Sequence, residues 1–305
     1  MKKIFIIILA ALLSLSCLAF AACSGETADP TQTNQPGGAQ TDNSGATPEN
    51  MINSYITFSG TSYTATDSSA LKVDGSALAI TKAGTYEISG TLDNGQIIVE
   101  VTKAEKVTLI LNNFTGHNES SAVIWVKSAD KVYLELKDGT TNTLTDGATY
   151  VFANPTDTKP NACIYASDDL SIKGYGTLIV KGNYNNGIGC KNDLSINNAK
   201  VTVTAVNNAI KGNGSVTVKG DADVLVEGAE DAIKTDSLNV GKGFLLITEN
   251  AKVTVHCEDD GLQATQDITV TTGATVTTYA KGNAVNCDGT VNIDEGCLTE
   301  NVPEA

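Results

Sequence analysis

Short stretches of alternating apolar and polar residues run through most of the chain and predict β-strands. Examples are 107–111, 132–136 and 177–180, where Val, Leu or Ile occupy every second position and a polar turn follows. A period of two is typical of a strand that buries one of its two faces. Val, Ile and Thr favour strands, and Asn, Asp and Gly favour turns. We therefore expect an all-β protein.

A tripeptide recurs in the second half of the chain and defines a repeat. It consists of Asn or Asp, a small residue and an aliphatic residue, and it begins at positions 186, 208, 231, 260 and 283. Successive copies are 22, 23, 29 and 23 residues apart, with two further short strands between them. An immunoglobulin-like sandwich does not produce a residue identity at a fixed phase. The spacing predicts a single-stranded parallel β-helix of 22–29 residues per coil.

The boundaries follow from where this regularity begins. We expect an N-terminal β region or cap over 51–95 and the parallel β-helix over 96–305. The coil of 29 residues is predicted to carry an insertion, and residues 240–244 are our candidate for it.

Stacking of coils converts the repeat into ladders. Adjacent coils of a β-helix lie ~4.8 Å apart, so residues of the same phase line up along the axis. The aliphatic ladder is expected inside and contains Ile188, Ile210, Ile233, Leu262 and Val285. The ladder two positions earlier contains Asn186, Asn208, Asp231, Asp260 and Asn283, and the residue before it is Asn185, Asn207, Glu230, Asp259 or Gly282. Stacked Asn side chains hydrogen-bond to one another, so the Asn positions also have a purely structural explanation.

Two adjacent coils are acidic. Glu230 and Asp231 stack on Asp259 and Asp260, with Glu258 close by. Two unit charges about 5 Å apart repel by roughly 3 kcal/mol at an effective dielectric constant of ~20. Calcium suits such a cluster because it takes several oxygen ligands from carboxylates, amides and water. The predicted ligands are Glu230, Asp231, Asp259, Asp260, Asn208 and Asn283. The alternative is a solvated acidic face that Lys211 or Lys234 neutralises.

The N-terminus carries a targeting pattern. Lys2 and Lys3 precede an apolar run over 4–15, and small residues lead to Cys23. This pattern predicts a lipoprotein signal peptide over 1–22 with lipidation at Cys23; the alternative is an ordinary signal peptide cleaved just before it. Residues 23–50 are too polar to bury a core and predict a disordered, lipid-anchored linker. We expect the protein on the extracellular face of a bacterial cell membrane.

Composition narrows the partners. The net charge is −15, and all 20 basic residues are lysines. Nucleic acid is not an expected partner, because its phosphates are met by a basic face. Without Arg there is no guanidinium fork to hold a carboxylate, so a divalent cation is the expected bridge to an acidic ligand. Outside Cys17 and Cys23 there are five cysteines, an odd number without a CxxC pair, so we expect no disulfide framework. With only two histidines, no zinc site is expected.

Five segments carry a resemblance to a known family. They are GTYEISG (84–90), VKSADKV (126–132), DGTTNTLTDG (138–147), SDDLSI (167–172) and GNYN (182–185). The chain resembles bacterial cell-surface carbohydrate-binding domain-containing proteins. The resemblance implies a right-handed parallel β-helix similar to polysaccharide lyases, calcium along one face, and affinity for pectin-type acidic sugars and cellulose. Coils of that family repeat Asp-Asp-Gly-Ile, whereas three coils here lack the acidic pair, so we expect one or two calcium ions.

Three functions are compatible with this pattern. In the first, which we favour, a non-catalytic module binds polygalacturonate or pectin, and cellulose, through calcium. Its predicted sugar-binding residues are Tyr184, Asn186, Lys211 and Lys234. In the second, a calcium-dependent pectate-type lyase uses Lys211 or Lys234 as the base that removes the proton beside the uronate carboxylate. In the third, the solenoid is only an adhesin or spacer.

Overall fold

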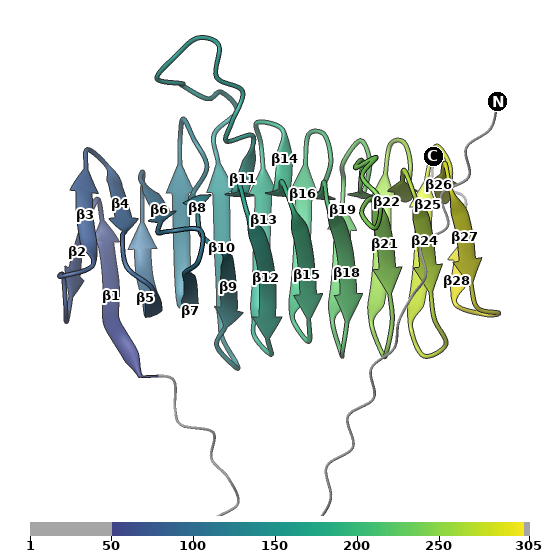
Figure 1. The fold of residues 1–305 in the computed structure, drawn as a ribbon, viewed down its shortest axis with the longest axis horizontal. Helices are drawn as coiled ribbons and strands as arrows, with labels where there is room; N and C mark the ends of the chain where they lie inside the picture. The colour runs from purple at the N-terminus through teal and green to yellow at the C-terminus, as the bar shows by residue number, and fades with distance from the viewer. Residues whose placement is uncertain (1–50, 302–305) are drawn as a thin grey trace, which may run out of the picture. The chain divides into compact units, whose positions relative to one another are not determined.

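The structure is a computed structural model that describes residues 51–301. Every regular secondary-structure element in that range is a β-strand. The predicted signal peptide, Cys23 and the linker to Asn50 lie outside the described residues. Among residues 51–301 there is no helix of the length and apolarity that a membrane span requires. The strands stack along the long axis of the molecule (Figure 1).

Three rows of parallel strands form the solenoid, as the repeat predicts. The first row comprises β6 (Gln96–Glu100), β8 (Ile124–Ser128), β11 (Ala162–Ala166), β14 (Asn186–Cys190), β17 (Ile210–Gly212), β20 (Ile233–Lys234), β23 (Leu262–Ala264) and β26 (Val285–Cys287). The second comprises β9 (Lys131–Leu136), β12 (Asp169–Gly174), β15 (Asp193–Asn197), β18 (Ser215–Lys219), β21 (Phe244–Ile247), β24 (Asp267–Val270) and β27 (Thr290–Ile293). The third comprises β10 (Thr141–Asp146), β13 (Thr177–Gly182), β16 (Lys200–Ala205), β19 (Asp223–Glu227), β22 (Lys252–Cys257), β25 (Thr275–Ala280) and β28 (Leu298–Glu300). The chain is therefore a parallel β-helix with three strands per coil.

The N-terminal strands continue these rows and add antiparallel pairs. They are β1 (Ile52–Gly60), β2 (Ser62–Ala65), β3 (Leu71–Asp74), β4 (Ala77–Ile80), β5 (Gly84–Leu92) and the long β7 (Lys106–Asn118). The β1–β2 and β3–β4 pairs are antiparallel, whereas β4 pairs with β6 in parallel. Strand β7 pairs with both β9 and β10 and so joins the second and third rows.

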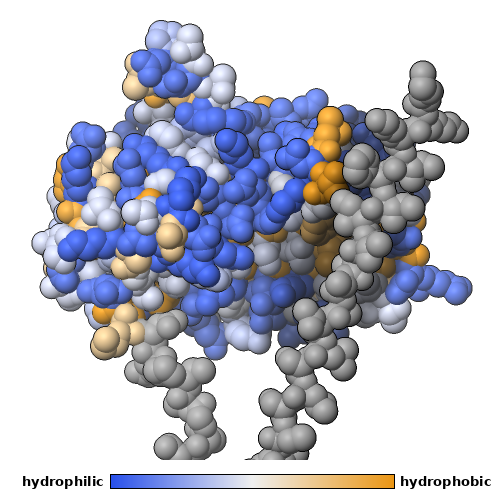
Figure 2. Space-filling view, in the orientation of Figure 1, coloured by the Kyte–Doolittle hydropathy of each residue, from blue (hydrophilic) through white to orange (hydrophobic). Residues whose placement is uncertain are grey.

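One continuous apolar core fills the solenoid. The predicted aliphatic ladder is confirmed, since Ile188, Ile210, Ile233, Leu262 and Val285 pair in register along the first row. The first four are fully buried and belong to a core cluster that extends from Ile56 to Cys297. Burying one such side chain contributes about 1.5–3 kcal/mol, so the ladders are the main source of stability. The face in Figure 2 is mostly hydrophilic, with small hydrophobic patches.

Coil length varies more than the tripeptide spacing indicates. The predicted insertion in the coil of 29 residues is present between β20 and β21, where it spans 235–243. A longer insertion over 147–161 separates β10 from β11 and projects as the teal loop at the top of Figure 1. Because of it, Ile124 pairs with Ile164, 40 positions further along the chain and beyond the expected range.

The cysteines of the described residues are free thiols, in agreement with the sequence analysis. Cys163, Cys190, Cys257 and Cys297 are buried, and Cys287 is half-buried. They fill the interior as small apolar side chains.

Candidate functional site

The first residue of each tripeptide stands at the start of a first-row strand or just before it. Asn186, Asn208, Asp231 and Asp260 are all buried. The side-chain oxygens of Asn186, Asp231 and Asp260 accept a backbone N–H group of the following coil. Asn208 N donates to Asn186 Oδ1 at 3.2 Å, and Asn283 N donates to Asp260 Oδ1 at 3.0 Å. Asn208 Nδ2 also donates to Asn186 Oδ1 at 2.7 Å. The structural role predicted for stacked Asn is therefore present, and the polar ladder holds successive coils together.

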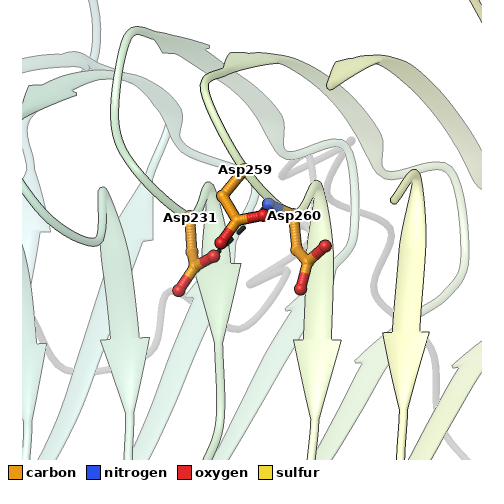
Figure 3. A group of neighbouring side chains, drawn as sticks. All are labelled: Asp231, Asp259 and Asp260. Atoms are coloured by element: carbon orange, nitrogen blue, oxygen red, sulfur yellow. Dashed lines mark hydrogen bonds between the residues drawn. The ribbon is translucent and has the colours of Figure 1, made fainter. Parts of the chain in front are cut away.

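Three carboxylates gather where the ladder becomes acidic. Asp231, Asp259 and Asp260 each place one carboxylate oxygen within 4.8 Å of the others. In Figure 3 the Asp259 side chain lies between those of Asp231 and Asp260, which belong to adjacent coils. Asp231 and Asp260 are buried, whereas Asp259 is exposed. Stacking of the two coils therefore brings these three of the predicted residues together.

The cluster is partly compensated by neighbouring donors. Lys234 Nζ lies 2.8 Å from Asp231 Oδ2, so one of the predicted counter-charges is present. Asp260 accepts hydrogen bonds from Asn283 N and Nδ2 at its Oδ1, and from Gln263 and Asn286 amides at its Oδ2. Burial alone raises the pKa of Asp260, but the bonds from Asn286 and Asn283 together outweigh it and hold the pKa below its usual value.

Acceptor capacity is distributed unevenly over the three aspartates. A carboxylate has about four lone-pair sites, and those of Asp260 are all engaged. Asp231 accepts from Lys234 Nζ and from Asp260 N, which leaves about two. Asp259 accepts no hydrogen bond from residues 51–301, so its oxygens are the most available.

Two further oxygens beside the cluster are buried without a hydrogen-bond partner among the described residues. They are Asn208 Oδ1, on the coil before Asp231, and Gln263 Oε1, whose amide donates to Asp260. Orphaned buried acceptors are costly and call for a partner. The open carboxylate oxygens of Asp231 and Asp259 are donors of the kind that calcium prefers, so the cluster fits a calcium ion. Burial, and next the charge of Asp231, raise the pKa of Cys257 to about 11, so its thiol is not an available thiolate ligand.

Four of the residues expected at or beside the acidic cluster lie outside it or make other contacts. Glu230 is exposed and outside the group of three carboxylates, and Glu258 pairs with Lys281 at 2.7 Å. Asn283 approaches Asp260 with its N–H groups, so it acts there as a donor and not as an oxygen ligand. Lys211 does not neutralise the cluster either, because its Nζ pairs with Asp236 at 2.6 Å.

The residue three positions after each Asn or Asp of the ladder, which directly follows the aliphatic residue, lies on the side of the first-row strand away from the core. These residues align in register. Along the axis the aligned residues are Trp125, Tyr165, Gly189, Lys211, Lys234, Gln263 and Asn286. We call this set the outer row. It changes from aromatic, through a glycine, to cationic and then to amide side chains. Its register places Lys211 and Lys234 side by side, as the sequence predicts.

A cleft of about 250 Å³ opens in the outer row at Gly189. Asn186 and Lys211, both predicted to bind sugar, line it. Lys159 and Lys191 also line it, and sequence reasoning missed both. Lys191 directly follows β14 and could have been found from the register, whereas the position of Lys159 depends on the fold of the insertion over 147–161.

Tyr184 is the remaining predicted sugar-binding residue, and it lies apart from the cleft lining. Its ring stacks on Tyr150 with centroids 4.0 Å apart and planes 12° from parallel. Phe152 packs against the edge of the same pair. One face of Tyr184 is therefore occupied by the insertion over 147–161.

Comparisons with known proteins agree with this architecture. Residues 74–301 match the family described as "Carbohydrate-binding domain-containing protein". A protein of that description from Acetivibrio thermocellus is 40% identical over 284 residues, which cover 93% of this chain and 94% of that protein. A solved structure of a polysaccharide lyase-like protein from C. thermocellum, a gadolinium derivative, has a TM-score of 0.79 at 40% identity and covers 82% of this chain and 100% of its own. The chain belongs to the family of carbohydrate-binding domain-containing proteins.

Proposed function

We propose that this protein is a non-catalytic module that captures an acidic, pectin-type polysaccharide through calcium held at Asp231, Asp259 and Asp260. The observation that carries the proposal is the convergence of these three carboxylates within 4.8 Å, beside a solvent-facing row of the solenoid. A bound calcium ion would neutralise the cluster and accept a uronate carboxylate as a further ligand. Cellulose is a second proposed ligand, on the family resemblance alone.

Each residue of the cluster has a distinct part in this proposal. Asp259, which is exposed and accepts no hydrogen bond among the described residues, offers both of its oxygens. Asp231 offers the lone pairs that Lys234 and the Asp260 N–H leave open. Asp260 keeps the next coil in place through three hydrogen bonds, from Asn283 N, Asn283 Nδ2 and Asn286 Nδ2. Gadolinium is a hard cation that, like calcium, takes oxygen ligands, so the derivative of the similar structure supports using a lanthanide as a probe.

The lyase alternative requires a neutral amine near the cation. Lys234 is bound to Asp231 and Lys211 to Asp236, so both candidate bases are engaged as ammonium donors. An ammonium group has no lone pair with which to remove a proton. This is why we propose binding without catalysis, although the similar structure is called polysaccharide lyase-like.

We further propose that the module works at the cell surface, attached through a lipid on Cys23. The support is the sequence pattern before Cys23 and the polar composition of residues 24–50. A tether of this kind would hold a captured polymer close to the membrane.

The test is calcium-dependent retention on immobilised polygalacturonate, together with calcium and terbium titrations. We expect wild type to be retained in calcium and released by chelator. Asp231→Asn combined with Asp259→Asn should weaken calcium binding by at least about tenfold, or ~1.4 kcal/mol, because it removes both available carboxylates. Asp223→Asn, an exposed carboxylate on β19, is the matched control and should behave as wild type.

Two outcomes would contradict the proposal. Retention that is unchanged in excess chelator would remove calcium from the mechanism. A sustained rise in absorbance from unsaturated uronide product, abolished by Lys211→Ala or Lys234→Ala, would show that the protein is a lyase.

A further inference from the structure

A cleft opens beside Gly189, with Tyr165 and Lys211 among the residues that line it. Gly189 pairs with Tyr165 on one neighbouring strand and with Lys211 on the other. The Tyr165 ring packs over the glycine, where a Cβ would lie 3.3 Å from Tyr165 Cδ2 and 3.0 Å from Ala162 Cβ, and the cleft of about 250 Å³ is lined by this ring and by Lys211. The cleft opens on the solvent side, because Ile188 and Cys190, on either side of the glycine, point into the core.

The cleft is cationic in a protein that is strongly anionic. Lys159, Lys191 and Lys211 line it, and none of the described residues that line it is Asp or Glu. Within residues 51–301, Lys159 and Lys191 form no ion pair, and only Lys211 has a carboxylate partner, Asp236. Even with Asp236 counted, positive charge exceeds negative charge here, against a net charge of −15 for the chain.

The lysines reach the cleft from three separate parts of the chain. Lys159 comes from the insertion over 147–161, Lys191 follows β14, and Lys211 lies on β17. Lys159 Nζ lies 5.5 Å from the centroid of the Tyr165 ring, which gives it one favourable partner. Partial burial of its ammonium group, and next the charge of Lys211, lower the pKa of Lys159 from its ordinary value, although the residue as a whole is exposed. An anion in the cleft would relieve the repulsion between these ammonium groups.

We propose that this cleft is an anion-binding subsite that receives the carboxylate of an acidic sugar directly, without a metal ion. The inference rests on the proposed function for the choice of an acidic sugar, but its contacts are separate from those of the aspartate cluster. Three ammonium groups donate to the carboxylate oxygens. The side chain of Asn186 is already engaged, with Asn161 O and with Asn208, so it shapes the wall of the cleft and leaves the anion to the lysines.

The test separates this subsite from the calcium site by working in excess chelator. Trigalacturonate is titrated into the whole protein by calorimetry, with cellotriose as the uncharged probe. We expect trigalacturonate to bind, cellotriose to bind more weakly, and the affinity for trigalacturonate to fall as NaCl screens the lysines. Lys159→Gln combined with Lys191→Gln should lower that affinity by at least about fivefold. Both side chains are exposed, so folding is expected to persist.

Lys181→Gln combined with Lys200→Gln is the matched control. These lysines are exposed on β13 and β16 and do not line the cleft, and the control removes the same total charge. Equal affinities of the two double variants would overturn the inference, because net charge alone would then explain binding. So would the absence of trigalacturonate binding in chelator. Either result would leave calcium-dependent retention, and with it the proposed function, to stand or fall on its own test.

Discussion

At the scale of single residues, Asp260 is the centre of the polar ladder. Its carboxylate connects its own coil, through Gln263, to the next coil, through Asn283 and Asn286. Hydrogen bonds to a charged group contribute about 1.5–3 kcal/mol each when they are well formed. Because these bonds stabilise the ionised carboxylate, the pKa of Asp260 is lowered in the folded protein despite burial, which acts in the opposite direction.

Asp260 should therefore make the stability of the folded protein depend on pH in the acidic range. A carboxyl group whose folded pKa is lowered stabilises the fold at pH values above its unfolded pKa, near 3.8, and loses that contribution as pH falls through the folded value. Asp260→Asn should cost about 1–3 kcal/mol at pH 6 and less at pH 3. Thermal unfolding of both proteins in chelator measures the difference. Parallel stability profiles over this range would contradict the assignment.

The sequence located the aspartates of the site but not their partners. The spacing of 29 residues between Asp231 and Asp260 was enough to stack them, because register fixes which residues of successive coils are neighbours. The sequence indicated Lys211 and Lys234 equally as counter-charges, of which only Lys234 pairs with Asp231, and it did not reveal that amides saturate Asp260. Those contacts depend on side-chain conformations, although the residues themselves, Lys234, Gln263 and Asn286, recur three positions after each ladder residue.

At the scale of elements, the three strand rows were predictable and the longest insertion was not. The repeat signature is missing in the coil that follows this insertion, since Ala162 pairs with Asn186 and stands where other coils have Asn or Asp. Because that polar residue is absent, the tripeptide cannot be recognised in the sequence before position 186. The length of the insertion over 147–161 therefore could not be derived from the distance between tripeptides. The position of Lys159, which lies in this insertion, could not be derived either.

This insertion is anchored by one hydroxyl group. Tyr150 Oη donates to Asp146 Oδ2 at 2.6 Å and lies 3.0 Å from Ala162 O, at the two ends of the insertion. Asp146 is fully buried, and burial raises its pKa although the Tyr150 hydroxyl opposes this. The stacked ring of Tyr184 covers the anchor.

Tyr150→Phe should accordingly destabilise the fold by about 1–3 kcal/mol, because it leaves a buried carboxylate oxygen without its donor. Denaturant unfolding measures the loss. Tyr175→Phe is the control, since Tyr175 is 64% exposed and its hydroxyl should contribute little. If the two variants are equally stable, the hydroxyl of Tyr150 does not anchor the insertion.

At the scale of the whole molecule, the two proposed subsites share one side of one row of strands. Gly189 lies on β14, and Asp231 lies just before β20, the second strand after β14 in the first row. At the usual spacing of stacked strands the two coils are ~10 Å apart. The cleft contributes ammonium groups and the acidic cluster contributes calcium. A single uronate chain running along the axis could then be held at both, and binding at one would raise the effective concentration at the other.

Chain length should therefore control affinity. In calcium, we expect hexagalacturonate to bind at least about tenfold more tightly than digalacturonate, because a dimer reaches only one of the two subsites and the longer chain spans both. Asp259→Asn, or Lys159→Gln with Lys191→Gln, should each remove most of that advantage, and combining them should have less than an additive effect. Calorimetry with both oligomers measures this, with Lys181→Gln as the control. Equal affinities of the two oligomers in calcium would mean that the two subsites do not hold one chain, since a ligand that reaches only one of them gains nothing from added length.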